Sequence, residues 1–507
     1  MVHRRMPDMR LWLFLLLVSL YVTVRSACGN EKLRQWLLHA VLVVVLVESV
    51  WGWLQLYDFT PSYHSLYKIT GSLFNPGPYA GFVAVGVPLA LTYAIDKQHS
   101  RWERWLGSAT LLATLLVLPA TGSRAAWLAA LVGIILVGGR HLFIRNWLLK
   151  NIRWRRWLVV VGVSLTICLL AGLYFMKKNS ADGRWLIWQI STEAIKEHPL
   201  FGTGFGSFSA IYGNAQASWF LSGKGTDAQM TVADSPEYAF NEYVQILVEL
   251  GIVGLALFLA VMVFCIGLPV AERHFSATTA SLLTWLVFAA FSYPFSVLPL
   301  SILLVVLLAI AASSSQELRV KKRLHTWLRT VFWMIGITVT IYSSYHILPR
   351  RTAYHEWAML QTLYHSDTYK EILKDYEALY DALCFEKKFL FEYGQCLSKT
   401  GNYQQSNRLF EEYLRYGSDP MVFNCMGNNY KLMQEFGKAE NAYFRASQII
   451  PNRHYPLYLL MKLYDETGQS NKAHEMAERL LNKPVKVPST AIREMQQEAK
   501  NIQKSNQ

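Results

Sequence analysis

Charged residues are scarce in this sequence. Asp, Glu, Lys and Arg make up 17% of its 507 residues, whereas soluble globular domains carry about 25%. The 6 Cys, 17 Pro and 30 Gly are too few for a disulfide scaffold, a collagen or a low-complexity disordered chain. Metal-ligand spacings of Cys and His, Walker sequences and Gly-x-Ser-x-Gly sequences are also lacking. We therefore expect neither a metal nor a nucleotide cofactor.

Long apolar runs are the main feature of the sequence. Hydrophobic residues make up 52% of the chain, and a helix needs about 20 apolar residues in succession to cross a bilayer. Apolar runs of roughly this length occupy residues 11–24, 36–56, 74–95, 105–121, 124–139, 157–175, 242–267, 277–292, 294–312 and 326–348. We predict an all-α protein in which residues 1–348 form a polytopic membrane helix bundle of about ten spans.

The basic residues indicate how these spans are oriented. The formal net charge of +14 is compatible with nucleic-acid binding, but in a membrane protein Lys and Arg collect in cytoplasmic loops. The densely basic connectors 140–156 and 319–323 should therefore be cytoplasmic. Counting crossings from them places the turn at 121–124, the segment 177–240 and everything after Leu348 on the outer side. The lipid membrane, and not nucleic acid, is the expected partner.

The last third of the chain changes character and repeats itself. Tyr430 and Tyr464 are 34 residues apart, as are Ala439 and Ala473, and this is the period of tetratricopeptide repeats. We predict an α-solenoid of about three to four such repeats over 349–490, followed by a polar tail at 491–507. Because repeats of this kind form a concave binding surface, a protein partner is expected to bind through them.

The outer segment 177–240 is longer than a simple connector, and loops of such length are usually functional or disordered. It begins with an amphipathic stretch, Trp185 to Lys196, which is suited to lie at the membrane surface. A Gly-rich sequence, Gly202 to Gly206, follows. Its glycines permit either a sharp turn near the lipid or direct contact of backbone amides with a phosphate, and the turn is the simpler interpretation because no strand precedes it and no Lys-Ser/Thr follows.

Two arginines are placed on the outer side. Arg124 begins an apolar run and Arg184 begins the amphipathic stretch. Either side chain could anchor the protein at the lipid headgroups. The alternative is a diphosphate ligand, because each guanidinium can donate two parallel hydrogen bonds to phosphate oxygens.

Carboxylates also occur within the predicted spans, where they are costly unless they face protein or water. Glu242, Gln245 and Glu249 share one helix face, which predicts a polar stripe lining a cavity. Glu48 is isolated in the sequence, and a structural hydrogen bond to a neighbouring helix is its expected role.

Four segments, taken in order, resemble one family. They are 71–77 (Gly-Ser-Leu-Phe-Asn-Pro-Gly), 121–126 (Thr-Gly-Ser-Arg-Ala-Ala), 184–208 and 241–254. Together they resemble the O-antigen ligase superfamily, which includes O-antigen polymerases and bacterial protein O-oligosaccharyltransferases. The resemblance covers about residues 40–312.

The resemblance implies a glycosyltransferase that moves a preassembled glycan from an undecaprenyl-diphosphate carrier to an acceptor hydroxyl, without a metal or other cofactor. It also implies a multi-pass protein of the bacterial inner membrane, acting at the periplasmic face, with the repeats in the periplasm. By their match to the family's arginines, Arg124 and Arg184 would hold the diphosphate. The acceptor is left open among lipid A core, a growing polysaccharide and protein Ser/Thr.

One position departs from the family. The family usually has a His, proposed as the base that activates the acceptor, immediately before the Asn of the last segment; here Phe240 precedes Asn241. We expect Glu242 to act as the base, with Asn241 beside it in the catalytic group. His64, Asp182 and Asp234 are further candidates for the base.

Two other classes of function remain open on the sequence. A flippase of lipid-linked glycan should show paired broken helices in two internal repeats, and no such symmetry is visible in the sequence. A membrane-tethered scaffold, in which only the repeats act, would account for the loss of the His but not for the two outer arginines.

Overall fold

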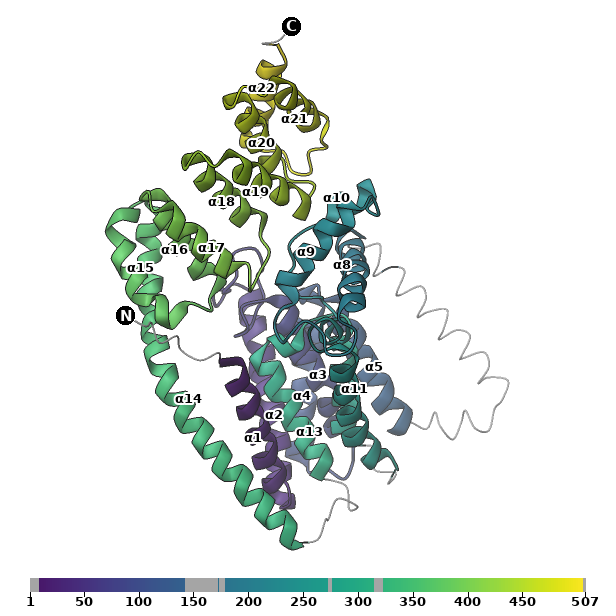
Figure 1. The fold of residues 1–507 in the computed structure, drawn as a ribbon. Coiled ribbons are helices and arrows are strands. Elements are labelled where there is room, and N and C mark those ends of the chain that lie inside the picture. Colours follow the sequence, from purple (N-terminus) through teal and green to yellow (C-terminus); the bar gives the residue numbers. More distant parts are fainter. Residues whose placement is uncertain (1–8, 142–171, 173–177, 272–275, 314–321, 505–507) are drawn as a thin grey trace.

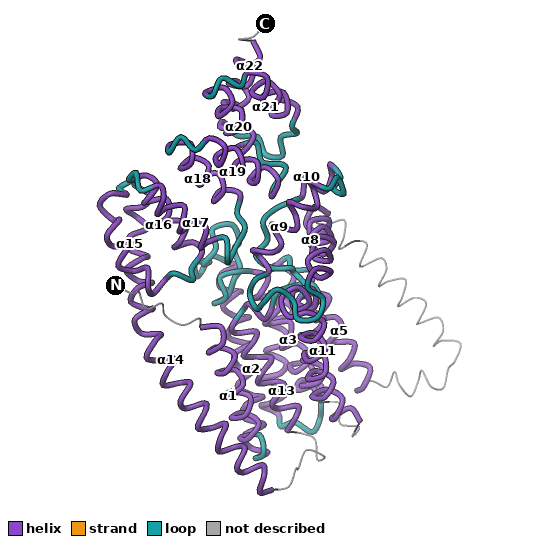
Figure 2. The backbone as a smooth tube through the Cα atoms, viewed as in Figure 1, coloured by secondary structure: helices purple, strands orange, loops and turns teal. Residues whose placement is uncertain are grey.

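The computed structural model describes residues 9–141, 172, 178–271, 276–313 and 322–504, and in these ranges the chain forms helices joined by loops (Figures 1 and 2). The prediction of an all-α protein is confirmed for them. The first part contains α1 (Met9–Ala27), α2 (Glu31–Leu56), α3 (Pro76–Ile95), α4 (Arg101–Val117), η1 (Pro119–Thr121), α5 (Arg124–His141), α8 (Lys178–Glu197), α9 (Phe208–Leu221), α10 (Asp227–Val232), α11 (Glu242–Ala271), α12 (Ala277–Ala289), η2 (Pro294–Ser296) and α13 (Leu298–Ser313). The second part contains α14 (Lys322–His365), α15 (Tyr369–Leu383), α16 (Lys387–Lys399), α17 (Tyr403–Tyr413), α18 (Pro420–Leu432), α19 (Phe436–Ile449), α20 (Tyr455–Glu466), α21 (Ser470–Asn482) and α22 (Thr490–Lys504).

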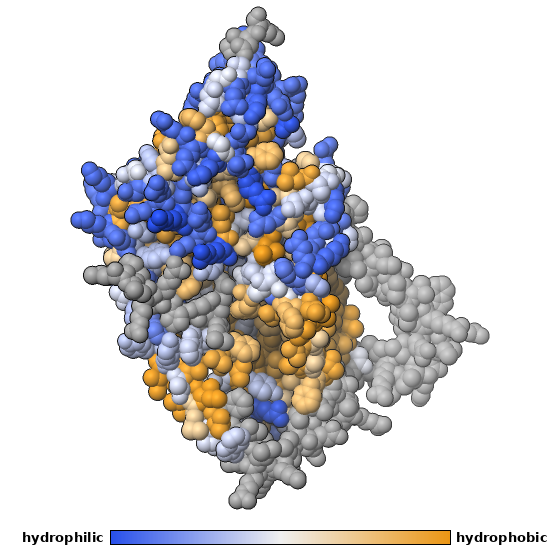
Figure 3. Space-filling model, in the orientation of Figure 1, coloured by the Kyte–Doolittle hydropathy of each residue, from blue (hydrophilic) through white to orange (hydrophobic). Residues whose placement is uncertain are grey.

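The predicted apolar runs coincide with helices, apart from the run at 157–175, which lies outside the described residues together with most of the basic connectors. Within the described part, Glu31–Leu56, Pro76–Ile95, Arg101–Thr121 and Glu242–Ile266 are long and apolar enough to cross a membrane, and further apolar helices are shorter. Figure 3 shows the matching surface, with apolar side chains over the bundle and hydrophilic ones over the C-terminal helices. The chain is a helical membrane protein; the number of crossings and their orientation stay predictions.

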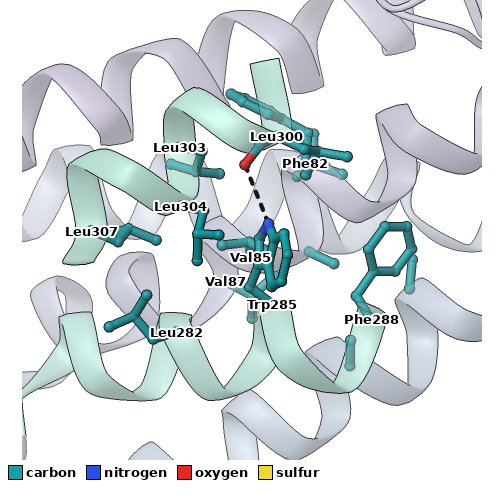
Figure 4. Packing of buried hydrophobic residues seen from close by; sticks show 14 of the residues in the cluster. Phe82, Val85, Val87, Leu282, Trp285, Phe288, Leu300, Leu303, Leu304 and Leu307 are labelled. Carbon is teal, nitrogen blue, oxygen red and sulfur yellow. Dashed lines mark hydrogen bonds between the residues drawn. The ribbon is translucent and has the colours of Figure 1, made fainter. Parts of the chain in front are cut away.

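Helix α3 lies at the centre of the bundle and packs against α2, α4, α5, α12 and α13. Its small residues allow this, because a methyl group at Gly81 would lie 2.2 Å from the ring of Phe288. Trp285 is fully buried beside them, and its indole nitrogen donates a hydrogen bond to the carbonyl oxygen of Leu300 (3.2 Å; Figure 4). The core thus joins α3, α12 and α13 at the end of the bundle where α3 begins.

The predicted boundary between the two domains, at 348/349, lies inside a single helix. Helix α14 runs from the far end of the bundle to the C-terminal helices (Figure 1), and Pro349 lies within it. Proline removes one backbone hydrogen bond from a helix interior, but here the helix continues through it. We call residues 369–504 the hairpin stack and the bundle end that faces it the stack end.

Successive antiparallel helices build the hairpin stack, with α16 packed on α17, α18 on α19 and α20 on α21. In the first two of these pairs, the first helix supplies a glycine where the second supplies an aromatic ring. A methyl group at Gly394 would lie 2.5 Å from Phe410, and one at Gly427 would lie 2.3 Å from Tyr443. The close approach of paired helices agrees with the predicted tetratricopeptide pattern, and the assignment to that repeat family stays a prediction.

The segment expected as a polar tail from residue 491 forms most of α22 instead. It packs against α20 and α21, with Ala499 fully buried and Met495 and Ile502 partly buried against the same cluster. These three residues follow a helical spacing of about 3.6, so the apolar stripe of α22 covers the open end of the hairpin stack.

The hairpin stack rests on the segment between α8 and α11. The amide nitrogen of Gln216 in α9 donates to the carbonyl oxygens of Ile449 and Asp234. On either side, the hydroxyl of Ser235 donates to the carbonyl oxygen of Ser418 at 2.6 Å, and Arg445 donates to Asn214 at 2.7 Å. These contacts fix the part of the chain that leads into α11.

A substitution at Gly213 of α9 tests the contact between α9 and the hairpin stack. A Cβ atom there would lie 2.0 Å from the hydroxyl oxygen of Ser418, so we expect Gly213→Leu to separate the hairpin stack from α9. Hydrogen exchange of residues 231–240 should then become faster, on the order of tenfold or more. A Cβ atom added at Gly437 of α19 would meet no atom within 4 Å, so Gly437→Leu is the matched control. Equal exchange in both variants would show that the contact does not hold this segment.

Candidate active site

Arg124 is placed by a tight turn at the stack end. Gly122 has φ 62° and ends η1, a conformation that favours glycine, and Arg124 is the first residue of α5. The indole nitrogen of Trp127 donates to the carbonyl oxygen of Leu118 at 2.8 Å and ties α5 back to the end of α4. Arg124 is therefore held at the start of α5, directly after the turn that follows α4, and its role in binding a diphosphate stays a prediction.

Arg184 reaches the same region from α8. Its guanidinium lies over the ring of Phe240, 5.0 Å from the ring centroid, and donates a hydrogen bond to the carbonyl oxygen of Phe291 at 2.9 Å. Burial lowers the pKa of Arg184, and the positive charge of Arg124 lowers it further. Two arginines that are 60 positions apart in sequence are thus close enough in space to repel each other, which favours a shared anionic ligand.

Phe240, at the position of the missing His, has φ 51°. Its ring meets that of Tyr293 edge to face at 5.4 Å, and Tyr293 stacks on Tyr238 at 4.4 Å. The three rings form a wall beside Arg184. The aromatic side chain therefore supports the guanidinium through its negative face.

Tyr293 was not identified from the sequence. It lies in the connection between α12 and η2, more than 50 positions after Phe240. Burial raises the pKa of Tyr293 to about 12, with Tyr238 adding to the rise and Arg184 opposing it. The phenol is thus protonated at neutral pH and can donate a hydrogen bond. The only sequence signal was an aromatic cluster, Phe-Ser-Tyr-Pro-Phe, between two apolar runs.

Asn241 and Glu242 lie at the start of α11. The amide oxygen of Asn241 accepts hydrogen bonds from the backbone nitrogens of Tyr243 and Val244 at 3.0 and 3.2 Å, which caps the helix. The Glu242 side chain is only 2% exposed and accepts a hydrogen bond from the backbone nitrogen of Phe295 at 2.7 Å. Both side chains thus have structural partners, and their catalytic roles stay predictions.

The Gly-rich sequence, Gly202 to Gly206, forms hydrogen bonds with α11 next to a break in that helix. Gly251 has φ 65° and ψ −167° within that helix, and the carbonyl oxygens of Val248 and Glu249 accept from the amides of Thr203 and Gly204 at 2.9 Å each. The Glu249 carboxylate accepts from the amide of Gly206 at 2.8 Å. Since these amides are already bonded to the protein, the structure favours the turn over direct phosphate contact.

The other candidate bases are dispersed. Asp182 lies two residues before Arg184 on α8, and His64 lies in the loop between α2 and α3. An oxygen of Asp234 accepts from the backbone nitrogen of Ser235 at 2.9 Å. Glu48 accepts two hydrogen bonds from Ser72, one from its hydroxyl and one from its backbone nitrogen. The carboxylate thus has a structural hydrogen-bonding role, as expected, but its partner lies in the loop between α2 and α3 and not in a neighbouring helix. Among the described residues, no group of His, Cys, Asp and Glu is arranged to hold a metal ion.

The fold and its apolar surface define a helical membrane protein. Residues 109–259 match the O-antigen ligase family, and this stretch of the chain is similar to glycosyltransferase-type enzymes of polysaccharide biosynthesis. The matched stretch contains Arg124, Arg184, Phe240, Asn241 and Glu242 and ends before Tyr293. No curated protein matches the chain.

Proposed function

We propose that the chain transfers a preassembled glycan from an undecaprenyl-diphosphate carrier to an acceptor hydroxyl at the periplasmic face of the inner membrane. The observation that carries this proposal is the pair of arginines at the stack end. Arg184 is partly buried against Phe240 and lies within the electrostatic field of Arg124. Two guanidinium groups held close together can bind the phosphate oxygens of a diphosphate.

The chemistry follows from this placement. The acceptor oxygen attacks the anomeric carbon of the first sugar, the bond from that carbon to the phosphate oxygen breaks, and its electron pair leaves with the diphosphate. Arg124 and Arg184 stabilise the charge that develops on the leaving group. A guanidinium has five N–H donors, and in the described structure Arg184 uses one for Phe291, so further donors can face the phosphates. We propose that the phenol of Tyr293, whose ring lies against Phe240 beside Arg184, donates to the same oxygens.

The proton of the acceptor hydroxyl requires a base. The sequence predicts Glu242 as this base, with Asn241 at its side, but an acceptor would have to reach a carboxylate that is 2% exposed. A second assignment is a positioning role, in which Glu242 holds the connection that carries Phe291 and Tyr293. In that case the proton leaves with the departing diphosphate or passes to water.

The hairpin stack is proposed to lie in the periplasm and to bring a protein acceptor or protein partner to the stack end. This rests on its contacts with α9 and with residues 231–237, which join the site at Phe240. The acceptor remains lipid A core, a growing polysaccharide or protein Ser/Thr. A polymerase is the second candidate, because the same family includes both activities.

Reconstitution tests the proposal. Purified protein in lipid, given an undecaprenyl-diphosphate-linked oligosaccharide and each acceptor class in turn, should produce glycosylated acceptor and free undecaprenyl diphosphate in equal amounts. Transfer should persist in a chelator, because the proposed chemistry needs no metal. Release of the glycan to water alone, with none of the acceptors, or movement of the donor across the bilayer without bond cleavage would contradict the proposal.

A further inference from the structure

A hollow lies in the loop between α2 and α3. Its volume is about 430 Å³, and it is lined by Gln55 and by most of residues 58–68. The resemblance to the O-antigen ligase superfamily involves only the end of this loop, at 71–77. The function proposed above therefore assigns no role to the hollow itself.

The walls of the hollow are held by a buried side chain. Gln55 is 1% exposed, and its amide oxygen accepts from the backbone nitrogens of Thr70 and Gly71 at 2.9 and 2.8 Å. Its amide nitrogen donates to the carbonyl oxygens of Pro61 and Gly71 at 3.2 Å each. With all these bonds inside the loop, the hollow is formed before any ligand arrives.

Polar groups of several kinds line the hollow. Asp58 and Lys68 form an exposed ion pair at 2.9 Å. Nδ1 of His64 accepts from the backbone nitrogen of Leu66 at 3.0 Å, so the neutral ring carries its proton on Nε2 and can donate it. The hydroxyl oxygen of Thr60 is buried in the wall and has no hydrogen-bond partner among the described residues.

Two aromatic rings add apolar surface. Phe59 is 77% exposed and Tyr67 is 50% exposed, and both line the hollow. A ligand that fits this mixture has hydroxyls that donate and accept, and flat apolar C–H faces that pack on rings. A sugar residue has both properties.

The hollow opens at the stack end. A Cβ atom at Gly52, near the end of α2, would lie 3.1 Å from Val117, the last residue of α4. The loop that follows α2 and the turn that carries Arg124 after α4 are therefore at the same end of the bundle.

We propose that this hollow binds a sugar residue of a glycan substrate, at a distance from the diphosphate. The inference rests on the proposed function, since it is the transfer reaction that brings a long glycan to this end. The glycan could belong to the donor or to a glycan acceptor, and both offer the same chemistry.

Two tyrosines of the loop allow a matched test. Tyr67 lines the hollow, whereas Tyr63 does not, and they are 50% and 52% exposed. The probe is the oligosaccharide freed from the lipid carrier by mild acid, and its binding to the purified full-length protein is followed by saturation-transfer NMR. We expect Tyr67→Ala to weaken binding at least tenfold, Tyr67→Phe to keep most of it, and Tyr63→Ala to leave it unchanged.

Steady-state kinetics then distinguish the source of the sugar. Tyr67→Ala should raise KM for the donor alone or for the glycan acceptor alone, with kcat retained. Because the binding experiment does not require transfer, it can succeed even where the proposed function fails. Equal loss with Tyr67→Ala and Tyr63→Ala would overturn the inference and assign both rings to the lipid interface, as would absence of binding to the unaltered protein.

Discussion

Arg184→Lys is expected to lower kcat for glycan transfer on the order of 100-fold or more, the cost of removing one preorganised donor at a developing negative charge. Lysine keeps the charge but offers a compact ammonium in place of a planar fork. It also loses the geometry in which the guanidinium lies over Phe240 and bonds to Phe291. The measurement is single-turnover transfer with purified protein in lipid, at equal protein levels.

Arg124→Lys should produce a loss of similar size, and the double variant should be little worse than either single variant, because residues that act on one group are strongly non-additive. Arg479→Lys is the control. Arg479 is an exposed arginine of the hairpin stack that pairs with Glu475 at 2.7 Å, far along the chain from the site. If both site variants transfer glycan at the rate of the unaltered protein, the arginines are lipid anchors and the diphosphate assignment is wrong.

The sequence drew attention to both arginines because each stands where the hydrophobic pattern changes, although Arg184 lies inside α8 and only Arg124 begins a helix; their roles stay predictions. Arg124 follows a Thr-Gly-Ser turn and begins an apolar run, and Arg184 begins an amphipathic one. The spans were predictable for the same reason, since the cost of burying polar groups in lipid forces long apolar runs.

Tyr293 and the carbonyl oxygen of Phe291 could not be predicted in the same way. The hydrogen bond from Arg184 to Phe291 joins residues 107 positions apart, and no local pattern encodes such a contact. The same applies to the amides of Thr203 and Gly204, whose partners are carbonyl groups freed by the break in α11. A Gly-rich sequence shows that the backbone can bend, but not which groups it will meet.

At the C-terminal end, the expectation of a polar tail was wrong although the sequence contains the helical pattern. The segment after residue 490 was read as a tail because most of its residues are polar, yet the spacing of Met495, Ala499 and Ile502 gives it one apolar stripe that packs on α20 and α21. In a helix that covers the end of a repeat array, a narrow stripe is sufficient and the exposed face is polar. Overall polarity was therefore a poorer guide than periodicity.

The role of Glu242 gives the second large expected effect. Glu242→Ala should lower transfer by about 10- to 100-fold, because the buried backbone nitrogen of Phe295 loses its partner at a cost of about 1–3 kcal/mol. This nitrogen lies two residues after Tyr293, so the loss displaces the ring wall beside Arg184.

Glu242→Gln distinguishes two roles of Glu242: holding the connection that carries Tyr293, or acting as the base that takes the proton of the acceptor hydroxyl. Glutamine keeps an oxygen for the nitrogen of Phe295 but cannot take up a proton at neutral pH. If Glu242 positions the connection, Glu242→Gln should keep most of the rate, and the pH profile of kcat should keep its shape. If Glu242 is the base, Glu242→Gln should fall as far as Glu242→Ala or further, since a general base contributes about 10²–10⁴-fold. Because the carboxylate is 2% exposed and already bonded to Phe295, we expect the first result.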